Sequence, residues 1–204
     1  MTSAGNLEWM ISNFLSDNEL IGIKGNVYDY CNKIVGSLTA QECSVIFLPF
    51  LFGTNVNPDA KACFIGIDGS QKTAHMIRAI YEGVVFSHMM HIEKLLEFRD
   101  KPEAVRISGG ATESKVWVQM FADVLQLPIE VSAAKELGTL GCAMCVGVAA
   151  GDYNDLNSAA DKMARVAYTC KPNKDNALVY RKKYAIYKQL IETLDSTWQM
   201  WRDY

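Results

Sequence analysis

The part of this sequence best suited to chemistry is a pair of glycines between an expected strand and an expected helix. Residues 104–108 have the pattern of a strand, Gly109 and Gly110 follow, and a helix is expected from Glu113 to Leu125. Glycine lets the backbone turn with positive φ and lets a bulky ligand approach without meeting a Cβ atom. Because the helix start adds free N–H groups, the arrangement suits a nucleotide. A plain tight turn shows the same pattern, and neither a Walker loop nor a full dinucleotide fingerprint is present.

A second candidate is the loop that begins at Gly53. It follows a continuous apolar run, residues 45–52, and continues as a polar, turn-rich segment to residue 61. The backbone amide of Gly53 could approach a phosphate group. Residue chemistry alone favours the simpler interpretation, in which these residues are only a connection rich in turn formers.

Two pairs of side chains have the chemistry of metal ligands but lack the spacing of a metal site. His88 and His91 could share one face of a helix, yet there is no glutamate between them and no third ligand at a useful distance along the chain. Cys142 and Cys145 lie in a helix of small residues without a second cysteine pair. We interpret the histidines as surface or packing residues and the cysteines as small hydrophobic residues, and we expect no metal site in this chain.

The elements that must position these residues alternate between helix and strand. Apolar residues with helical spacing predict helices, and short continuous apolar runs predict strands. The order predicts an α/β fold in one domain, residues 1–204, with a mixed sheet flanked by helices. The predicted helices cover residues 7–20, 26–36, 71–97, 113–125, 137–150 and 175–201, and the predicted strands cover residues 45–52, 62–67, 104–108 and 129–131.

Two details of the long helices can be predicted. Asp68 or Ser70 could cap the helix over residues 71–97, whose inward residues would be Met76, Ile80, Val84 and Val85. In the last helix, aromatic residues recur at helical spacing without a basic groove beside them. We therefore expect a packing stripe rather than a base-stacking surface, formed by Tyr180, Tyr184, Tyr187, Trp198 and Trp201.

The composition excludes several classes of protein. The 204 residues are 50% hydrophobic and carry a net charge of −3, so a nucleic-acid-binding surface is not expected. No apolar run is long enough for a membrane span, and the first residues do not resemble a secretory signal. We therefore expect a cytoplasmic protein whose six cysteines are free thiols.

Four motifs in order resemble the FGGY family of carbohydrate kinases. The segment Ala62–Glu82 fits the second signature of that family, and Phe47–Asp59 is similar to the strand and loop before it in xylulose kinases. Ser108–Trp117 resembles the adenosine motif of the family, and Glu136–Met144 resembles the start of the following helix. Gly5-x-x-x-Trp9 also fits the family's entry into this domain.

The resemblance implies one lobe of a two-lobed enzyme that uses ATP and Mg²⁺. The lobe would be ribonuclease-H-like, as in the actin-like ATPases, and it would be the C-terminal one, so that the N-terminal lobe is absent from this chain. That absent lobe carries the phosphate loop, most sugar contacts and the catalytic aspartate, so no catalytic residue is expected here. Asp68-Gly69-Ser70 is superficially similar to the phosphate loop but lies inside the second signature. The residues implied to bind the nucleotide are Gly53, Gly109, Gly110, Ala111 and Ser114.

The function implied is transfer of the γ-phosphoryl group of ATP to a sugar hydroxyl. A ketopentose such as xylulose or L-xylulose is favoured, and the sugar would reach the site through the absent lobe. The chain alone would then be inactive, and its exposed cleft surface could drive formation of a homodimer. Two alternatives stay open: a stand-alone module that binds a nucleotide or a protein partner without catalysis, and an α/β domain that binds no nucleotide.

Overall fold

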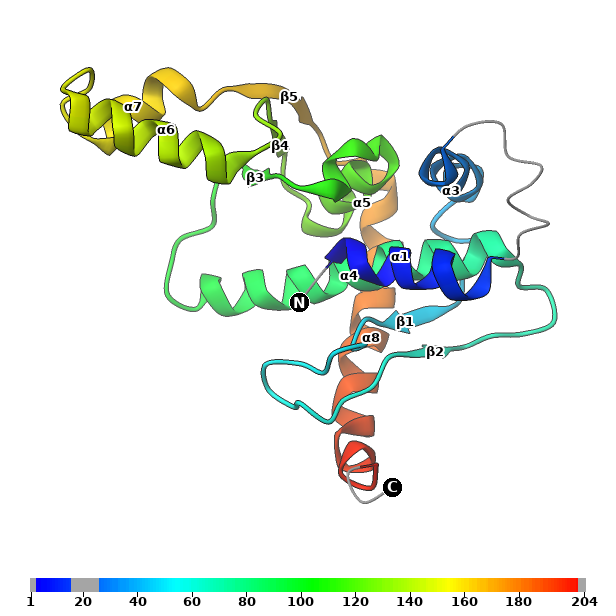
Figure 1. The fold of residues 1–204 in the computed structure, drawn as a ribbon. Helices are drawn as coiled ribbons and strands as arrows, with labels where there is room; N and C mark the ends of the chain where they lie inside the picture. Colours follow the sequence, from blue (N-terminus) through cyan, green and yellow to red (C-terminus); the bar gives the residue numbers. More distant parts are fainter. Residues whose placement is uncertain (1–2, 16–25, 202–204) are drawn as a thin grey trace.

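Helix α4 (Thr73–Leu96) is the element around which the chain is arranged (Figure 1). The computed structural model describes residues 3–15 and 26–201 of the protein. Residues 77–87 of α4 are all buried, including charged Arg78 and Glu82. Four helices and one strand pack against α4, namely α1 (Ser3–Phe14), α3 (Val27–Gly36), α5 (Lys115–Leu125), α8 (Ala177–Gln199) and β1 (Ile46–Leu48).

The strands form two separate small sheets. In the first, β1 pairs antiparallel with β2 (Cys63–Ile65), so that Phe47 lies opposite Phe64. In the second, β3 (Val105–Ile107) pairs parallel with β4 (Ile129–Ser132), and β4 pairs antiparallel with β5 (Val166–Cys170). The second sheet is therefore mixed, as the sequence predicts. The first predicted strand is shorter than expected, because β1 ends one residue before Pro49, which has no N–H to donate.

Two elements were missed by the sequence patterns. Helix α7 (Leu156–Met163) begins with a capping box in which Asp155 accepts from the N–H of Ser158. Strand β5, with the sequence Val-Ala-Tyr-Thr-Cys, is apolar at four of its five positions, although four of its residues are exposed, and the sequence analysis did not assign it. Helix α6 (Leu137–Ala150), which was predicted at these bounds, pairs with α7, and the two helices project from one side of the molecule (Figure 1).

The ends of two predicted helices differ from expectation. Helix α4 begins after Lys72, not at Asp68 or Ser70, and the Lys72 N–H donates to His75 Nδ1 at 3.0 Å. The carboxylate of Asp68 instead accepts from the backbone and hydroxyl of Ser70 within the preceding turn. Helix α1 begins at Ser3, earlier than predicted, and residues 16–20 of that prediction lie outside the described residues.

The aromatic stripe of α8 packs against α4 as predicted, with one exception. Four of its aromatic residues are buried, namely Tyr180, Tyr184, Tyr187 and Trp198. The three tyrosines pack around Phe86 of α4. The prediction was wrong for Trp201, whose exposed fraction is 54%. Trp201 lies two residues beyond Gln199, the last residue of α8, so it is not held on the packed face of the helix. Of the helices in the described part of the chain, none is both long enough and apolar enough to cross a membrane.

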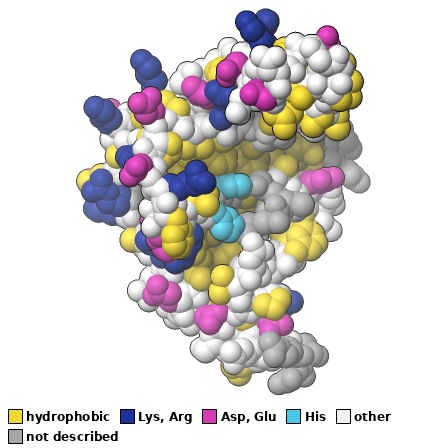
Figure 2. Space-filling model, turned by 90° about the vertical axis from the view of Figure 1, so that its left-hand side faces the viewer, with side chains coloured by type: hydrophobic (Ala, Val, Ile, Leu, Met, Phe, Trp, Pro, Cys, Tyr) yellow, Lys and Arg dark blue, Asp and Glu magenta, His cyan; other side chains and the backbone are white. Residues whose placement is uncertain are grey.

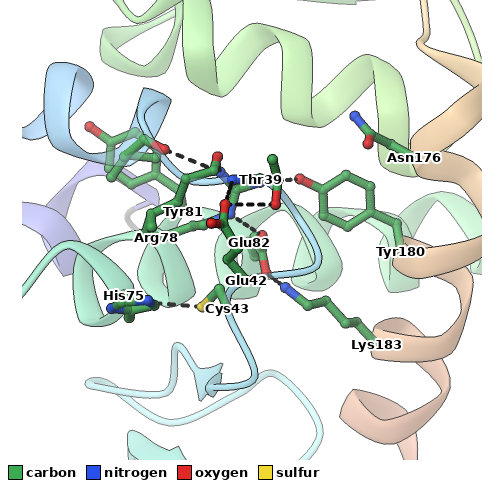
Figure 3. A network of polar contacts seen from close by, with 12 residues as sticks. Thr39, Glu42, Cys43, His75, Arg78, Tyr81, Glu82, Asn176, Tyr180 and Lys183 are labelled. Atoms are coloured by element: carbon green, nitrogen blue, oxygen red, sulfur yellow. Dashed lines mark hydrogen bonds and ion pairs between the residues drawn. The ribbon is translucent and has the colours of Figure 1, made fainter. Parts of the chain in front are cut away.

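A buried cluster of charges joins α4 to α8 and to the turn after α3 (Figure 3). Glu82 accepts from Arg78 Nε at 2.8 Å and from Lys183 Nζ of α8. The guanidinium of Arg78 also donates to the hydroxyl of Tyr180 at 2.9 Å and to the carbonyl of Leu38 at 2.6 Å. Burial of a charge is costly unless the charge is paired and hydrogen-bonded. Here both oxygens of Glu82 and three nitrogens of Arg78 have partners, so the cluster can stay ionised in the core.

Candidate nucleotide site

Two cavities meet at the glycine pair between β3 and α5. The larger has a volume of about 1010 Å³ and lies between α1, β3 and α4. The smaller has a volume of about 370 Å³ and lies between α1, α3 and the start of α5. Gly110 and Ala4 line both. Figure 2 views the molecule from the side on which α6 and α7 project and shows a hollow with hydrophobic side chains in its floor.

The glycine turn has the backbone conformation that requires glycine. Gly109 has φ of 95°, a region that other residues adopt only with strain, and a Cβ there would meet no atom within 4 Å. Gly110 begins the short 3₁₀ helix η1 (Gly110–Glu113), and Ala111 follows on the wall of the larger cavity. The predicted helix over residues 113–125 is thus divided, because the chain becomes extended at Ser114 before α5 begins.

Ser114 lies on the wall of the smaller cavity but is 5% exposed. Its hydroxyl accepts from the backbone N–H of Trp117 at 3.1 Å, which caps helix α5. The same hydroxyl donates to Asn32 Oδ1 at 2.6 Å. Four of the five residues implied to bind a nucleotide therefore form one continuous stretch beside the two cavities: Gly109, Gly110, Ala111 and Ser114.

Gly53 is not brought to this stretch. Its φ is 72°, and a Cβ at this position would come within 2.4 Å of the carbonyl oxygen of Pro58. The close contact within its own loop is enough to require glycine. Neither cavity is lined by Gly53, whereas the neighbouring Phe52, 82% exposed, lines the larger one. A phosphate contact for Gly53 stays a prediction.

Several residues of the site were missed by the sequence patterns. The start of α1 brings Ala4, Gly5 and Glu8 to the larger cavity, and α3 brings Asp29 and Asn32 to the smaller one. The spacing Gly5-x-x-x-Trp9 was a signal for the first group, although it assigned no role. No local pattern marks Asn32, because its partners Tyr81 and Ser114 are 49 and 82 residues away along the chain.

The aromatic wall of the smaller cavity is rigid. The rings of Tyr81 and Trp117 stack with centroids 4.2 Å apart and planes 14° apart. Trp117 Nε1 donates to the carbonyl of Tyr81 at 3.0 Å, and the Tyr81 hydroxyl donates to Asn32 Oδ1 at 2.9 Å. Burial raises the pKa of Tyr81 above its ordinary value, so this hydroxyl keeps its proton.

The histidine pair lies in α4 and the cysteine pair lies in α6. His88 lines the larger cavity, where burial is the main cause that lowers its pKa. Cys142 and Cys145 are exposed on α6, so their interpretation as buried hydrophobic residues was wrong. Within the described ranges, no group of three His, Cys, Asp or Glu side chains could hold a metal ion.

The sequence matches a family model over most of its length. The model for the C-terminal domain of the FGGY family of carbohydrate kinases matches residues 1–150. The chain belongs to the FGGY family. Among FGGY relatives, L-xylulose/3-keto-L-gulonate kinase of Escherichia coli (strain K12) is 36% identical over 95% of this chain, and a gluconokinase of Bacillus subtilis (strain 168) is 28% identical over 97%.

The fold is also that of solved FGGY kinases. Xylulose kinase of Lactobacillus acidophilus superposes with a TM-score of 0.84 at 22% identity, over 97% of this chain and 39% of the other. Plasmodium falciparum glycerol kinase with ADP gives a TM-score of 0.75 at 24% identity, over 94% and 37%. The expected α/β, actin-like lobe is therefore confirmed. The chain spans 37% of the length of its E. coli relative.

Proposed function

We propose that this chain is the ATP-binding half of a carbohydrate kinase and forms a single C-terminal lobe over residues 1–204. The observation that carries the proposal is the stretch from Gly109 to Ser114 in a chain of the FGGY family. This stretch borders two cavities that share Ala4 and Gly110 in their walls. Four of the five nucleotide-binding residues implied by the resemblance lie in this stretch.

The two cavities suggest how the nucleotide lies. The smaller has aromatic and amide side chains on its wall and the size of a small ligand site, for which about 300 Å³ is the lower limit, so we assign it to the nucleoside. Gly110 and Ala4 border both cavities, so we propose that the phosphate chain passes from the smaller to the larger beside two residues with little or no side chain. Within the described residues no group of three ligands forms a cage for a metal ion, so we propose that the Mg²⁺ that accompanies ATP would be held mainly by the phosphates.

For the whole protein we propose a cytoplasmic enzyme that phosphorylates a ketopentose. A sugar hydroxyl attacks the γ-phosphorus, its proton passes to a carboxylate, and the bond to the departing ADP breaks. L-Xylulose is favoured because the E. coli relative is an L-xylulose/3-keto-L-gulonate kinase. The relatives are longer than this chain, and the carboxylate and sugar contacts would come from the part that it does not match.

Titration calorimetry with ATP and ADP tests the nucleotide site in this chain. We expect weak binding that is lost in the variant Gly110→Leu, because a side chain at residue 110 projects between the two cavities. Gly138→Leu on the exposed part of α6 is the matched control, since a Cβ there meets no atom within 4 Å. An absence of binding at millimolar nucleotide, or equal binding by Gly110→Leu, would overturn the proposal.

An assay of ADP formation tests whether this chain can catalyse phosphoryl transfer by itself. With ATP and xylulose or L-xylulose, this chain alone should form no ADP above the sugar-free control. Turnover comparable with that of an intact sugar kinase would show that the chain contains its own catalytic base.

A further inference from the structure

The hydroxyl of Ser114 has no proton left for a ligand. It accepts from the N–H of Trp117 and donates to Asn32 Oδ1, and its residue is buried. A serine hydroxyl has one proton to donate. A nucleotide in the smaller cavity therefore cannot be recognised by donation from Ser114, even though this residue lies on the cavity wall.

Asn32 is the group through which this network reaches the cavity. Its Oδ1 accepts from two hydroxyls, Ser114 at 2.6 Å and Tyr81 at 2.9 Å. An amide oxygen has two lone pairs, so both are used and the amide plane is held in one orientation. Among the described residues, the Nδ2 atom has no acceptor, and Asn32 lines the smaller cavity. The amide therefore faces a ligand as a donor only.

The donor is held in place before any ligand arrives. Tyr81 is 1% exposed and stacks on Trp117, which is 2% exposed and anchored to the Tyr81 carbonyl. Ser114 is fixed as the N-cap of α5. A donor that is already oriented loses little conformational entropy on binding, so it adds more to affinity and specificity than a mobile side chain would.

We propose that Asn32 recognises the purine base of the nucleotide by donating a hydrogen bond from Nδ2 to a ring nitrogen. This inference rests on the assignment of the smaller cavity to the nucleoside. The N1, N3 and N7 atoms of adenine are acceptors, whereas its exocyclic amino group is a donor that a donor-only amide cannot bind. Ser114 and Tyr81 are positioning residues, because they act on the ligand through Asn32.

A thermodynamic cycle between residue 32 and the ligand tests the contact. The wild-type chain should bind one of 1-deaza-ATP, 3-deaza-ATP and 7-deaza-ATP about 3- to 10-fold more weakly than ATP, since each analogue lacks one ring acceptor. Asn32→Asp keeps an acceptor for both hydroxyls but removes the donor. This variant should bind ATP more weakly and show no preference for ATP over the discriminated analogue.

Two further variants control for charge and folding. Asn157→Asp makes the same change at an exposed position of α7 and should keep the wild-type preference. Asn32→Ala removes the donor without adding charge and should also lose the preference, with thermal unfolding measured alongside. If the wild-type chain binds ATP but does not discriminate against any of the three analogues, or if the discrimination persists without the amide, the role of Asn32 is overturned while the nucleotide site stands. If the wild-type chain binds no ATP, both fail.

Discussion

Two polar networks start from neighbouring residues of α4, and only one of them lines a cavity beside the glycine pair. Glu82 lies in the core, where both of its oxygens pair with buried cations. Tyr81, the preceding residue, lies on a different face of the helix. Its hydroxyl donates to Asn32, whose nitrogen faces a cavity. Each network joins segments far apart in the sequence. The comparison separates a network of paired charges that holds helices together in the core from a neutral network that lies at a cavity, where we propose that it meets a ligand.

The largest effect is expected from breaking the core network. Glu82→Ala leaves Arg78 and Lys183 buried without their counter-charge and should lower the free energy of unfolding by about 3–5 kcal/mol. Urea denaturation of the variant measures this loss. Glu97→Ala is the matched control, because its pair with Lys94 is exposed, and the change should stay within about 0.5 kcal/mol. Equal losses in the two variants would contradict a stabilising role for the core network.

A smaller loss of stability with a loss of binding is expected at Ser114. Ser114→Ala removes the N-cap of α5, which costs about 1 kcal/mol, and it frees Asn32 to rotate. Both the stability against urea and the affinity for ATP should decrease. Asp155→Ala removes the N-cap of α7, away from both cavities, and should lose stability while affinity is kept. Unchanged affinity in Ser114→Ala would show that Asn32 does not need its partner.

The smallest effects are expected from removing one tyrosine hydroxyl in each network. Burial raises the pKa of both Tyr81 and Tyr180, so in the folded chain these hydroxyls stay neutral beyond the pH of about 10 at which they ionise when unfolded. The unfolded chain then binds fewer protons, and stability should fall as the pH rises above that value. Tyr81→Phe and Tyr180→Phe should each make this fall less steep. Each should cost about 1 kcal/mol at neutral pH through one lost hydrogen bond.

Only one member of this tyrosine pair should affect the ligand. Tyr81→Phe removes a hydrogen bond that orients Asn32, so affinity for ATP should decrease. Tyr180→Phe weakens the core network and should leave the affinity unchanged. A decrease of equal size in both variants would mean that affinity follows overall stability rather than the orientation of Asn32.

Local backbone chemistry explains which parts of the fold and site could be predicted. The turn at Gly109 follows from residue types that are adjacent in the sequence, and the resemblance placed the neighbouring site residues in order. Helix α6 was predicted at its observed bounds from its composition and from that resemblance. Its exposure could not be predicted, because composition does not reveal whether another element covers a helix. For the same reason Cys142 and Cys145 were wrongly interpreted as buried.

The parts that sequence patterns missed depend on contacts between distant segments. Strand β5 is defined by pairing with β4, and its five residues are too few to be assigned from their types alone. Asn32 acquires its orientation from α4 and from the start of α5, which the sequence does not place beside α3. Gly53 is the opposite case, because a local contact is enough to explain it. The residue type suits a phosphate loop, but the close approach of Pro58 in the same loop already requires glycine.

The stack of Trp117 on Tyr81 also gives the molecule an optical reporter. The indole is 2% exposed, lines the smaller cavity and donates its N–H to a backbone carbonyl. Shielded in this way from water, Trp117 should emit at shorter wavelength than the exposed Trp201 of the same chain. A base that enters the cavity would lie close to this indole and could quench its fluorescence. The chain has four tryptophans, so occupancy of the site could be followed without a label once Trp9, Trp198 and Trp201 are replaced by phenylalanine.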